Sequence, residues 1–159
     1  MIGDTVKFTS VNPYRIKITG RTRNFINAVG EELIVENADK AITMACEKSG
    51  AVVNEYTAAP VYFGNKNNAA HEWYIEFEKL PDNIDFFTEL FDNALKSLNS
   101  DYEAKRYHDL VLDKPQIKSL PKGTFYKWLK NKGKLGGQNK VPRLSNNRNI
   151  IEEISKIIE

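Results

Sequence analysis

The chain has 159 residues, of which 41% are hydrophobic and 28% are charged, so it is long enough for one domain with a buried core and unlike a disordered or fibrous protein. Its formal net charge is +2, no apolar run approaches the ~18 residues that cross a bilayer, and the start MIGDTVKFTS lacks the layout of a signal peptide, so we predict a cytoplasmic protein. One cysteine excludes intrachain disulfides and cysteine-rich zinc sites, and two histidines are too few for a metal cluster, so we expect no metal site.

The N-terminal segment predicts a β-hairpin. In DTVKFT, Val6 and Phe8 alternate with polar residues, and in YRIKIT the same alternation places Tyr14, Ile16 and Ile18 on one side. The SVNP sequence between them is typical of a turn.

A short extended segment and a helix come next. We expect the extended segment at 32–35 and the helix at 37–49, with Asn37 as its N-cap and Gly50 as its stop. Cys46 shares one face of this helix with small and apolar residues. We therefore interpret it as a buried structural thiol rather than a nucleophile.

Two strands follow, at 51–63 and 71–80. Pro60 cannot donate to a sheet ladder, so the far end of the first strand should lie at an edge or a bulge. The second strand, HEWYIEFEKL, alternates most clearly. Its apolar face carries Trp73, Ile75 and Phe77, and its other face carries Glu72, Glu76 and Glu78.

The remaining periodicities predict helices and one more strand. We expect one helix at about 85–98 and a second one that begins with a capping box at Ser100 and Glu103. A third helix is expected at 123–133, with Thr124 as cap and Gly133 as stop, and a fourth from about 146 to the end. The strand is expected at 115–120. Interleaved strands and helices with short turns predict an α/β (α+β) fold, with a small mixed β-sheet flanked by helices and preceded by the hairpin. The element order resembles a split βαβ arrangement.

The positive charge is concentrated near the C-terminus. Residues 114–148 contain ten basic residues and no acidic one, so all 21 acidic residues and the other 13 basic residues lie elsewhere. This asymmetry indicates an anionic partner or a solvated basic face. Phe125, Tyr126 and Trp128 alternate with lysines there, which keeps open a nucleic-acid-binding module, although a core stripe would bury two of the three rings. A non-catalytic interaction domain is a third alternative.

Polar residues also follow glycines in several turns. The sequence contains no phosphate-binding loop, dinucleotide-binding glycine motif or nucleophile elbow. A carboxylate such as Asp4 can accept hydrogen bonds from a ribose diol, and arginines such as Arg21 and Arg23 can donate to hydroxyl or phosphate oxygens. Lys140 follows Gly136 and Gly137 and could deliver a compact positive charge to a phosphorus centre.

In this order, the segments GRTRNFINAVGEELIVENADKAI and GTFYKWLKNKGKLGGQNKVPRLSN resemble the C-terminal part of the auxin-responsive promoter family of acyl-acid amido synthetases, within the adenylate-forming superfamily. The resemblance covers nearly the whole chain, and two shorter segments, INAVGEELIVENADKA and GGQNKVPRLSN, are similar to the bacterial branch. It implies a ligase that joins a carboxylic acid to ATP, releases pyrophosphate and passes the acyl group to an amino acid.

The resemblance further implies a division into two domains. Residues 1–159 would form the smaller C-terminal domain, with 1–20 as a hairpin at the domain junction and 21–159 as the cap domain. The partner would be the enzyme's own N-terminal adenylation domain, which would bind most of the ATP, with Mg²⁺, as well as the carboxylic acid and amino acid substrates. With three residues before Asp4, we interpret the chain as a fragment that is inactive alone. No nucleic-acid or membrane partner is expected.

Four residues match positions of the superfamily's site. The resemblance implies that Asp4 grips the ribose hydroxyls and that Arg21 supports the same contact. Arg23 falls at the hinge position. Lys140 matches the lysine that reaches the α-phosphate and the carboxylate during adenylation. The two glycines would let the loop move Lys140, and Pro142 would hold the chain after it to the last helix.

Overall fold

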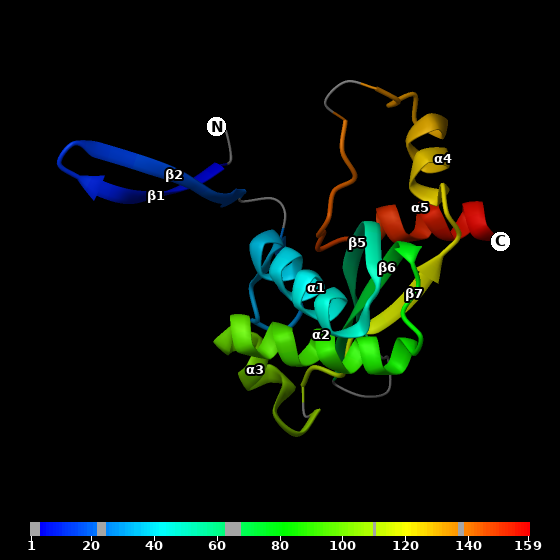
Figure 1. Ribbon diagram of the computed structural model, residues 1–159, viewed down its shortest axis with the longest axis horizontal. Helices are drawn as coiled ribbons and strands as arrows, with labels where there is room; N and C mark the ends of the chain where they lie inside the picture. Colours follow the sequence, from blue (N-terminus) through cyan, green and yellow to red (C-terminus); the bar gives the residue numbers. More distant parts are fainter. Residues whose placement is uncertain (1–3, 22–24, 63–67, 110, 137–138) are drawn as a thin grey trace.

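The computed structural model describes residues 4–21, 25–62, 68–109, 111–136 and 139–159 (Figure 1). The strands are β1 (Asp4–Val11), β2 (Tyr14–Arg21), β3 (Phe25–Ile26), β4 (Leu33–Ile34), β5 (Val52–Tyr62), β6 (Ala69–Lys79) and β7 (Gln116–Leu120). The helices are α1 (Val35–Ser49), α2 (Ile84–Leu98), α3 (Ser100–Arg106), the 3-10 turn η1 (Tyr107–Asp109), α4 (Thr124–Asn131) and α5 (Asn149–Ile158). None of the helices in these ranges combines the length and apolar composition that crossing a membrane requires.

The predicted hairpin forms and projects away from the rest of the domain (Figure 1). β1 and β2 pair antiparallel, and their apolar residues face one another in register, as in Phe8 opposite Ile16 and Val11 opposite Tyr14. Phe8 and Tyr14 also make an edge-to-face ring contact with centroids 5.9 Å apart. These four side chains and Val6 are between 53% and 78% exposed. The hairpin therefore presents an apolar surface that the body of the domain does not cover.

The central sheet has three strands in the order β5, β6, β7. β5 and β6 are antiparallel, whereas β6 and β7 are parallel and are connected through α2 and α3, so the sheet is mixed as predicted. The parallel strands are direct neighbours, and the expected split βαβ arrangement, which needs a strand between them, is wrong because β5 pairs with the other side of β6. Pro60 lies in β5, which is an edge strand of this sheet as expected.

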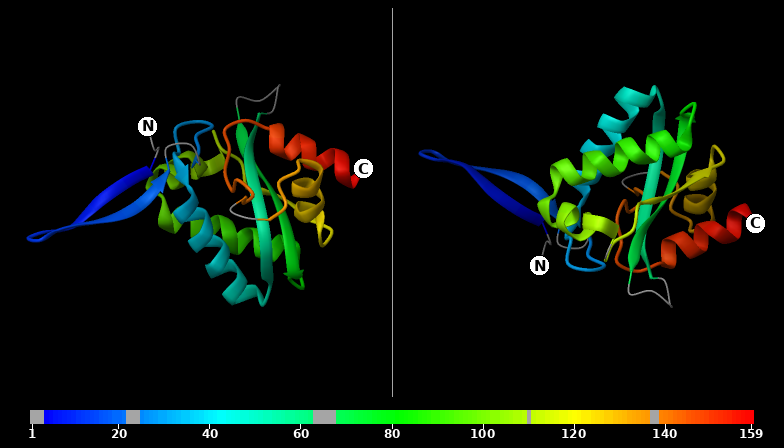
Figure 2. Two further views of the ribbon diagram at one scale, coloured as in Figure 1. Left: turned by 90° about the horizontal axis from the view of Figure 1, so that it is seen from above. Right: turned by 90° about the horizontal axis from the view of Figure 1, so that it is seen from below.

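Helices cover both faces of the sheet (Figure 2). α1 and α2 pack on one face, where Trp73, Ile75 and Phe77 of β6 enter the larger core with Phe87 and Phe91 of α2. The opposite face, from which Tyr74 points, is covered by α4 and α5. The alternation of β6 thus continues on both sides, and the glutamate face predicted for it is partly buried rather than open to water.

Three predicted helix caps are wrong. α1 begins after Ile34, so Asn37 lies inside the helix, where its side chain donates to the Leu98 carbonyl. α3 is capped by Asn99, one residue before Ser100. Thr124 is the first residue of α4, and its hydroxyl donates to the Pro121 carbonyl instead.

A buried carboxylate from the sheet caps the N-terminus of α4, the role that we expected for Thr124. Glu76, which is 4% exposed, accepts hydrogen bonds from the backbone N–H groups of Gly123 (3.0 Å) and Phe125 (3.2 Å) at the start of α4. It also accepts one from Asn54 (2.9 Å). Because a carboxylate is favoured at a helix N-terminus, Glu76 ties α4 to the sheet.

Candidate functional site

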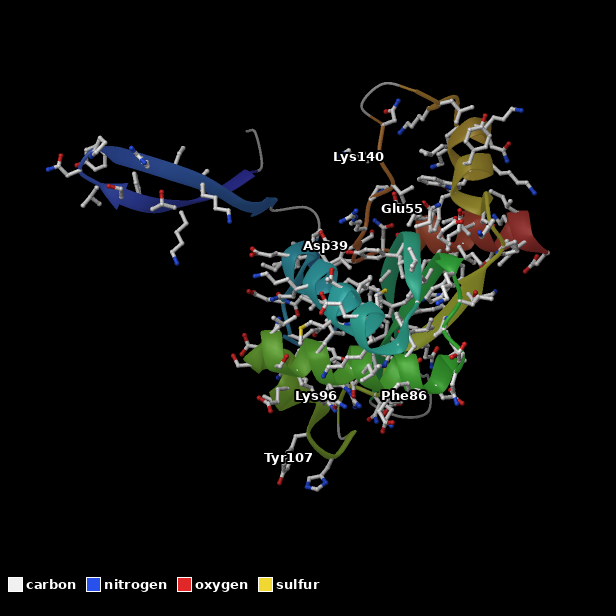
Figure 3. All side chains as sticks on the ribbon, in the orientation of Figure 1. Asp39, Glu55, Phe86, Lys96, Tyr107 and Lys140 are labelled. Carbon is white, nitrogen blue, oxygen red and sulfur yellow. The ribbon has the colours of Figure 1, made fainter. Side chains whose placement is uncertain are left out.

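The predicted site residues fall on two separate parts of the domain. Asp4 and Arg21 lie opposite each other in the register of β1 and β2, at the open end of the hairpin. Arg23 lies outside the described residues. Lys140 lies on the other side of α1 from the hairpin, on an extended segment above β5 (Figure 3).

This extended segment, residues 139–148, is here named the C-terminal strip. It runs beside the edge strand β5, where Leu144 forms an isolated parallel bridge to Ala58. The Ala58 N–H donates to the Arg143 carbonyl (2.9 Å), and the Ser145 N–H donates to the Ala58 carbonyl (3.0 Å). The strip is therefore hydrogen-bonded to the edge of the sheet and is not a free loop.

Two buried side chains fix the strip further. Val141 enters the smaller core with α4 and α5, and Leu144 enters the larger core on the opposite face. Between them, the Pro142 carbonyl accepts a hydrogen bond from the Thr57 hydroxyl (2.8 Å). Pro142 is thus held to β5, and the expectation that it holds the chain to the last helix is wrong. Gly136, before the strip, has a φ of +84°, which favours glycine, and Gly137 lies outside the described residues.

Three side chains lie around Arg143 of the strip. Together with Arg143 they are named the Arg143 cluster: Asp39, Glu55, Tyr56 and Arg143. Asp39 Oδ1 accepts hydrogen bonds from both the Arg143 Nη1 and the Tyr56 hydroxyl, each at 2.5 Å. The Arg143 guanidinium lies 5.3 Å from the centre of the Tyr56 ring, within cation–π range. Glu55 is a longer-range partner, with its Oε1 3.8 Å from Arg143 Nε.

The environment of the cluster favours charged arginine and neutral tyrosine. Burial raises the pKa of Tyr56, and its hydrogen bond to Asp39 raises it further, so the phenol stays protonated as a donor. Burial also raises the pKa of Glu55. Burial alone would lower the pKa of Arg143, but the acidic groups of the cluster outweigh it and raise that pKa. The cluster thus joins α1, β5 and the strip through one cation.

Lys140 lies three residues before this cation. Its side chain is exposed, and in the ranges that the structure describes no hydrogen bond or ion pair engages its ammonium group. Its neighbour Val141 is buried. An exposed cation therefore extends from a backbone whose next residues are fixed.

The sequence interpretation missed the Arg143 cluster. Its members are spread over residues 39–143, and each of them alone has a residue type that is ordinary for a helix, a strand or a basic segment. The one local signal was that Arg143 and Pro142 follow Lys140 closely. Covariation between Asp39 and Arg143 is the kind of signal that would have found the pair.

A second set of polar residues missed by that interpretation is buried and structural. Glu31 is fully buried and accepts hydrogen bonds from the N–H groups of Ala28 (2.7 Å) and Val29 (2.8 Å) and from His71 Nε2 (2.7 Å). On α2, Asp92 forms a buried ion pair with Arg106. Both sets hold loops against the larger core, and no group of metal-ligating side chains occurs within the described ranges.

The basic segment is partly paired with acidic residues on neighbouring elements. Lys122 pairs with Glu78 and Lys132 pairs with Glu153. Phe125 and Trp128 are buried under α5, as the core-stripe interpretation expected, whereas Tyr126 is 60% exposed. A surface on which several bases could stack is therefore not formed by these three rings, which weakens the nucleic-acid alternative.

Comparison with known proteins identifies the family. The domain combines an apolar hairpin, a three-layer α+β body and a free lysine on an edge strip, and a family model described as the GH3 family C-terminal domain matches it over residues 36–149. This match covers well over half of the chain, so the chain belongs to the GH3 family, in its C-terminal domain. The family resemblance of the sequence segments is thereby confirmed, while the bacterial branch stays a prediction.

Solved structures agree with this assignment. A structure titled GH3.15 acyl acid amido synthetase has a TM-score of 0.76 and 19% identity, covering 99% of this chain and 31% of that one. A second, titled AtGH3.15 acyl acid amido synthetase in complex with 2,4-DB, has a TM-score of 0.74 and 19% identity, covering 99% of this chain and 30% of that one. At this identity the likeness shows a common fold, and the chain spans less than a third of either protein. No curated protein matches the chain in sequence.

Proposed function

We propose that this chain is the C-terminal domain of an ATP-dependent acyl-acid amido synthetase, which adenylates a carboxylic acid and then conjugates it to an amino acid. The observation that supports this most directly is the family match, together with the coverage of 31% and 30% of two amido synthetase structures. In this proposal the larger remainder of the enzyme binds the acyl acid and most of the ATP with Mg²⁺, and the enzyme works in the cytoplasm.

Lys140 is the residue of this chain that acts in adenylation. An exposed, unpaired ammonium group on a fixed strip can approach the α-phosphate and the carboxylate oxygens as negative charge develops on them. Stabilisation of this kind is worth on the order of 3 kcal/mol, or roughly a hundredfold in rate. ATP supplies the adenylyl group, and Lys140 orients it and neutralises its charge.

Asp4 and Arg21 hold the ribose of the adenylate. The opposed register positions of Asp4 and Arg21 in the hairpin support this role, because a carboxylate can accept hydrogen bonds from ribose hydroxyls and a guanidinium can donate to them. Arg23, two residues after Arg21, serves as the hinge between the hairpin, 1–20, and the cap domain, 21–159.

The exposed apolar hairpin provides the contact with the larger domain. Val6, Phe8, Val11, Tyr14 and Ile16 together form an apolar surface of the kind that marks a protein interface. We infer that the N-terminal adenylation domain covers it. Without that domain, this chain alone has no measurable adenylation activity.

The proposal is tested by pyrophosphate exchange in the complete enzyme, with this domain joined to its acyl-binding domain. Lys140→Ala should lower the exchange rate roughly a hundredfold. Lys127→Ala is the matched control, because Lys127 is another exposed lysine of the basic segment, on α4, and this variant should exchange at the wild-type rate. Unchanged exchange by Lys140→Ala would refute the assignment.

The length of the reading frame distinguishes the enzyme proposal from the alternative of a non-catalytic interaction domain. If the reading frame continues upstream of Met1 for several hundred codons, the enzyme proposal is supported. Pyrophosphate exchange by this chain alone would contradict the proposal that adenylation requires the N-terminal domain.

A further inference from the structure

We propose that Arg143 is a positioning residue for Lys140: by binding α1 and β5 at once, it fixes the base of the C-terminal strip so that Lys140 meets the adenylate at one place. This inference rests on the proposed role of Lys140 in adenylation. Arg143 itself does not contact the reacting groups.

The contacts of Arg143 account for this role. Its backbone carbonyl is bound by Ala58 in β5, while its side chain crosses to Asp39 in α1 and covers the Tyr56 ring. A single residue therefore joins the strip to both the sheet and the helix layer. Figure 3 shows Asp39 and Glu55 beneath the part of the strip that carries Lys140.

Because Lys140 lies only three residues before Arg143, fixing Arg143 also restrains the backbone of Lys140. Three residues of extended chain span at most about 10 Å, and the two intervening residues are themselves restrained. Val141 is buried in the smaller core, and Pro142 has a restricted φ and a carbonyl bound by Thr57. Movement of Lys140 must therefore come chiefly from its own side chain.

The charge of Arg143 has a second effect on Lys140. Asp39 and Glu55 are two acidic groups beside the strip, and Arg143 is bonded to the first and lies 3.8 Å from the second. If Arg143 is removed, these carboxylates lose their cation while a free lysine remains three residues away. Three residues of extended chain separate the two backbones by at most about 10 Å, and opposite charges attract over such a distance, so Lys140 would be drawn toward them and away from the adenylate.

A double-mutant cycle in the complete enzyme tests this inference, using Lys140→Ala, Arg143→Ala and the double variant in pyrophosphate exchange. Arg143→Ala should lower kcat about tenfold, as expected for a misplaced catalytic group, with little change in the KM for ATP. In the Lys140→Ala background, the same substitution should change the rate less than about twofold, because two residues that act as one unit are not additive.

Two further variants separate positioning from folding. Arg143→Lys keeps a charge near Asp39 and should recover part of the lost rate. Tyr56→Phe removes one hydroxyl that shares Asp39 Oδ1 with Arg143, and should lower kcat in the same direction by a few-fold while the protein stays folded. This second variant keeps the inference testable if Arg143→Ala does not fold.

Arg148→Ala is the matched control. Arg148 also belongs to the strip, and it binds Glu72 and the Pro60 carbonyl, but it lies eight residues after Lys140. It should lower the melting temperature while leaving kcat within about twofold of wild type.

The outcomes distinguish the two proposals. If Lys140→Ala is slow but Arg143→Ala is at wild-type rate, or if the two losses multiply in the double variant, the positioning role is overturned and the role of Lys140 stands. If Lys140→Ala has no effect, the proposed function of Lys140 fails and the inference fails with it. A slow Arg143→Ala whose effect vanishes without Lys140 supports both.

Discussion

The buried carboxylate of Glu31 should stabilise the domain at neutral pH and lose this effect in acid. It accepts three hydrogen bonds of 2.7 to 2.8 Å, two from backbone N–H groups and one from His71. Burial alone would raise the pKa of Glu31, but these bonds, with that from His71 the strongest, lower it from the ordinary 4.5 to about 2. Replacing Glu31 by glutamine removes the charge while keeping the shape.

The expected magnitude follows from this pKa. Each tenfold change in proton affinity is worth about 1.4 kcal/mol, so the lowered pKa corresponds to about 3 kcal/mol of stability at pH 7. For a domain of this size that is roughly 6 to 12 °C in melting temperature. Because the folded-state pKa is the lower one, the contribution is complete above pH 4.5 and is lost as the pH falls toward 2.

Urea unfolding of wild type and Glu31→Gln, at pH 7 and at pH 3, measures this effect. The difference in unfolding free energy between the two proteins should shrink by about 2 kcal/mol at pH 3. Glu32→Gln, at the exposed neighbouring position, should show no such change with pH. A gap between wild type and Glu31→Gln that is the same at both pH values would show that the charge of Glu31 contributes nothing.

Two other predictions concern the hairpin and the cap of α4. The double variant Phe8→Ser with Ile16→Ser removes apolar surface from the hairpin and should reduce self-association of the isolated chain in sedimentation velocity. Tyr126→Ser, at an exposed ring of α4, should not reduce it. Equal association of wild type and these two variants would contradict an interface at the hairpin. Glu76→Ala leaves two helix N–H groups without their acceptor and should cost about 2 to 3 kcal/mol in urea unfolding. Glu78→Ala, at an exposed position of the same strand, should cost less than about 1 kcal/mol, and similar losses for both would refute the capping role.

Much of the fold could be predicted from the sequence because strand and helix periods are strong in this chain. The alternation of HEWYIEFEKL located β6 and its apolar face, and Gly50 marked the end of α1, where it adopts a φ of +70°. Cys46, predicted to be buried, is only half-buried against the larger core, and burial raises the pKa of its thiol.

The caps could not be predicted because their partners are distant in sequence. Thr124 has the residue type of a cap, but Glu76, on another element, reaches the same N–H groups. A local preference of about 1 kcal/mol is easily replaced by a tertiary contact of similar strength. Asn37 fails for the same reason, since its amide finds the Leu98 carbonyl.

The candidate site residues were selected from the sequence one by one, and their roles stay predictions, whereas their arrangement in space could not be predicted. Lys140 was marked by the glycines before it, and Asp4 and Arg21 by theirs, but spacing along the chain could not show that Lys140 is followed by a strip fixed to β5. The contact between Asp39 and Arg143 joins residues 104 positions apart. Such pairs arise only when the sheet and α1 are assembled.

The position of β6 in the middle of the sheet has a consequence for how the domain comes apart. Trp73 and Tyr74, adjacent in the chain, belong to different hydrophobic cores on opposite faces. If either layer of helices separates from the sheet, it exposes β6, against which the other layer also packs. The two halves should therefore melt together, in a single cooperative transition followed equally by the signals of Trp73 and Trp128.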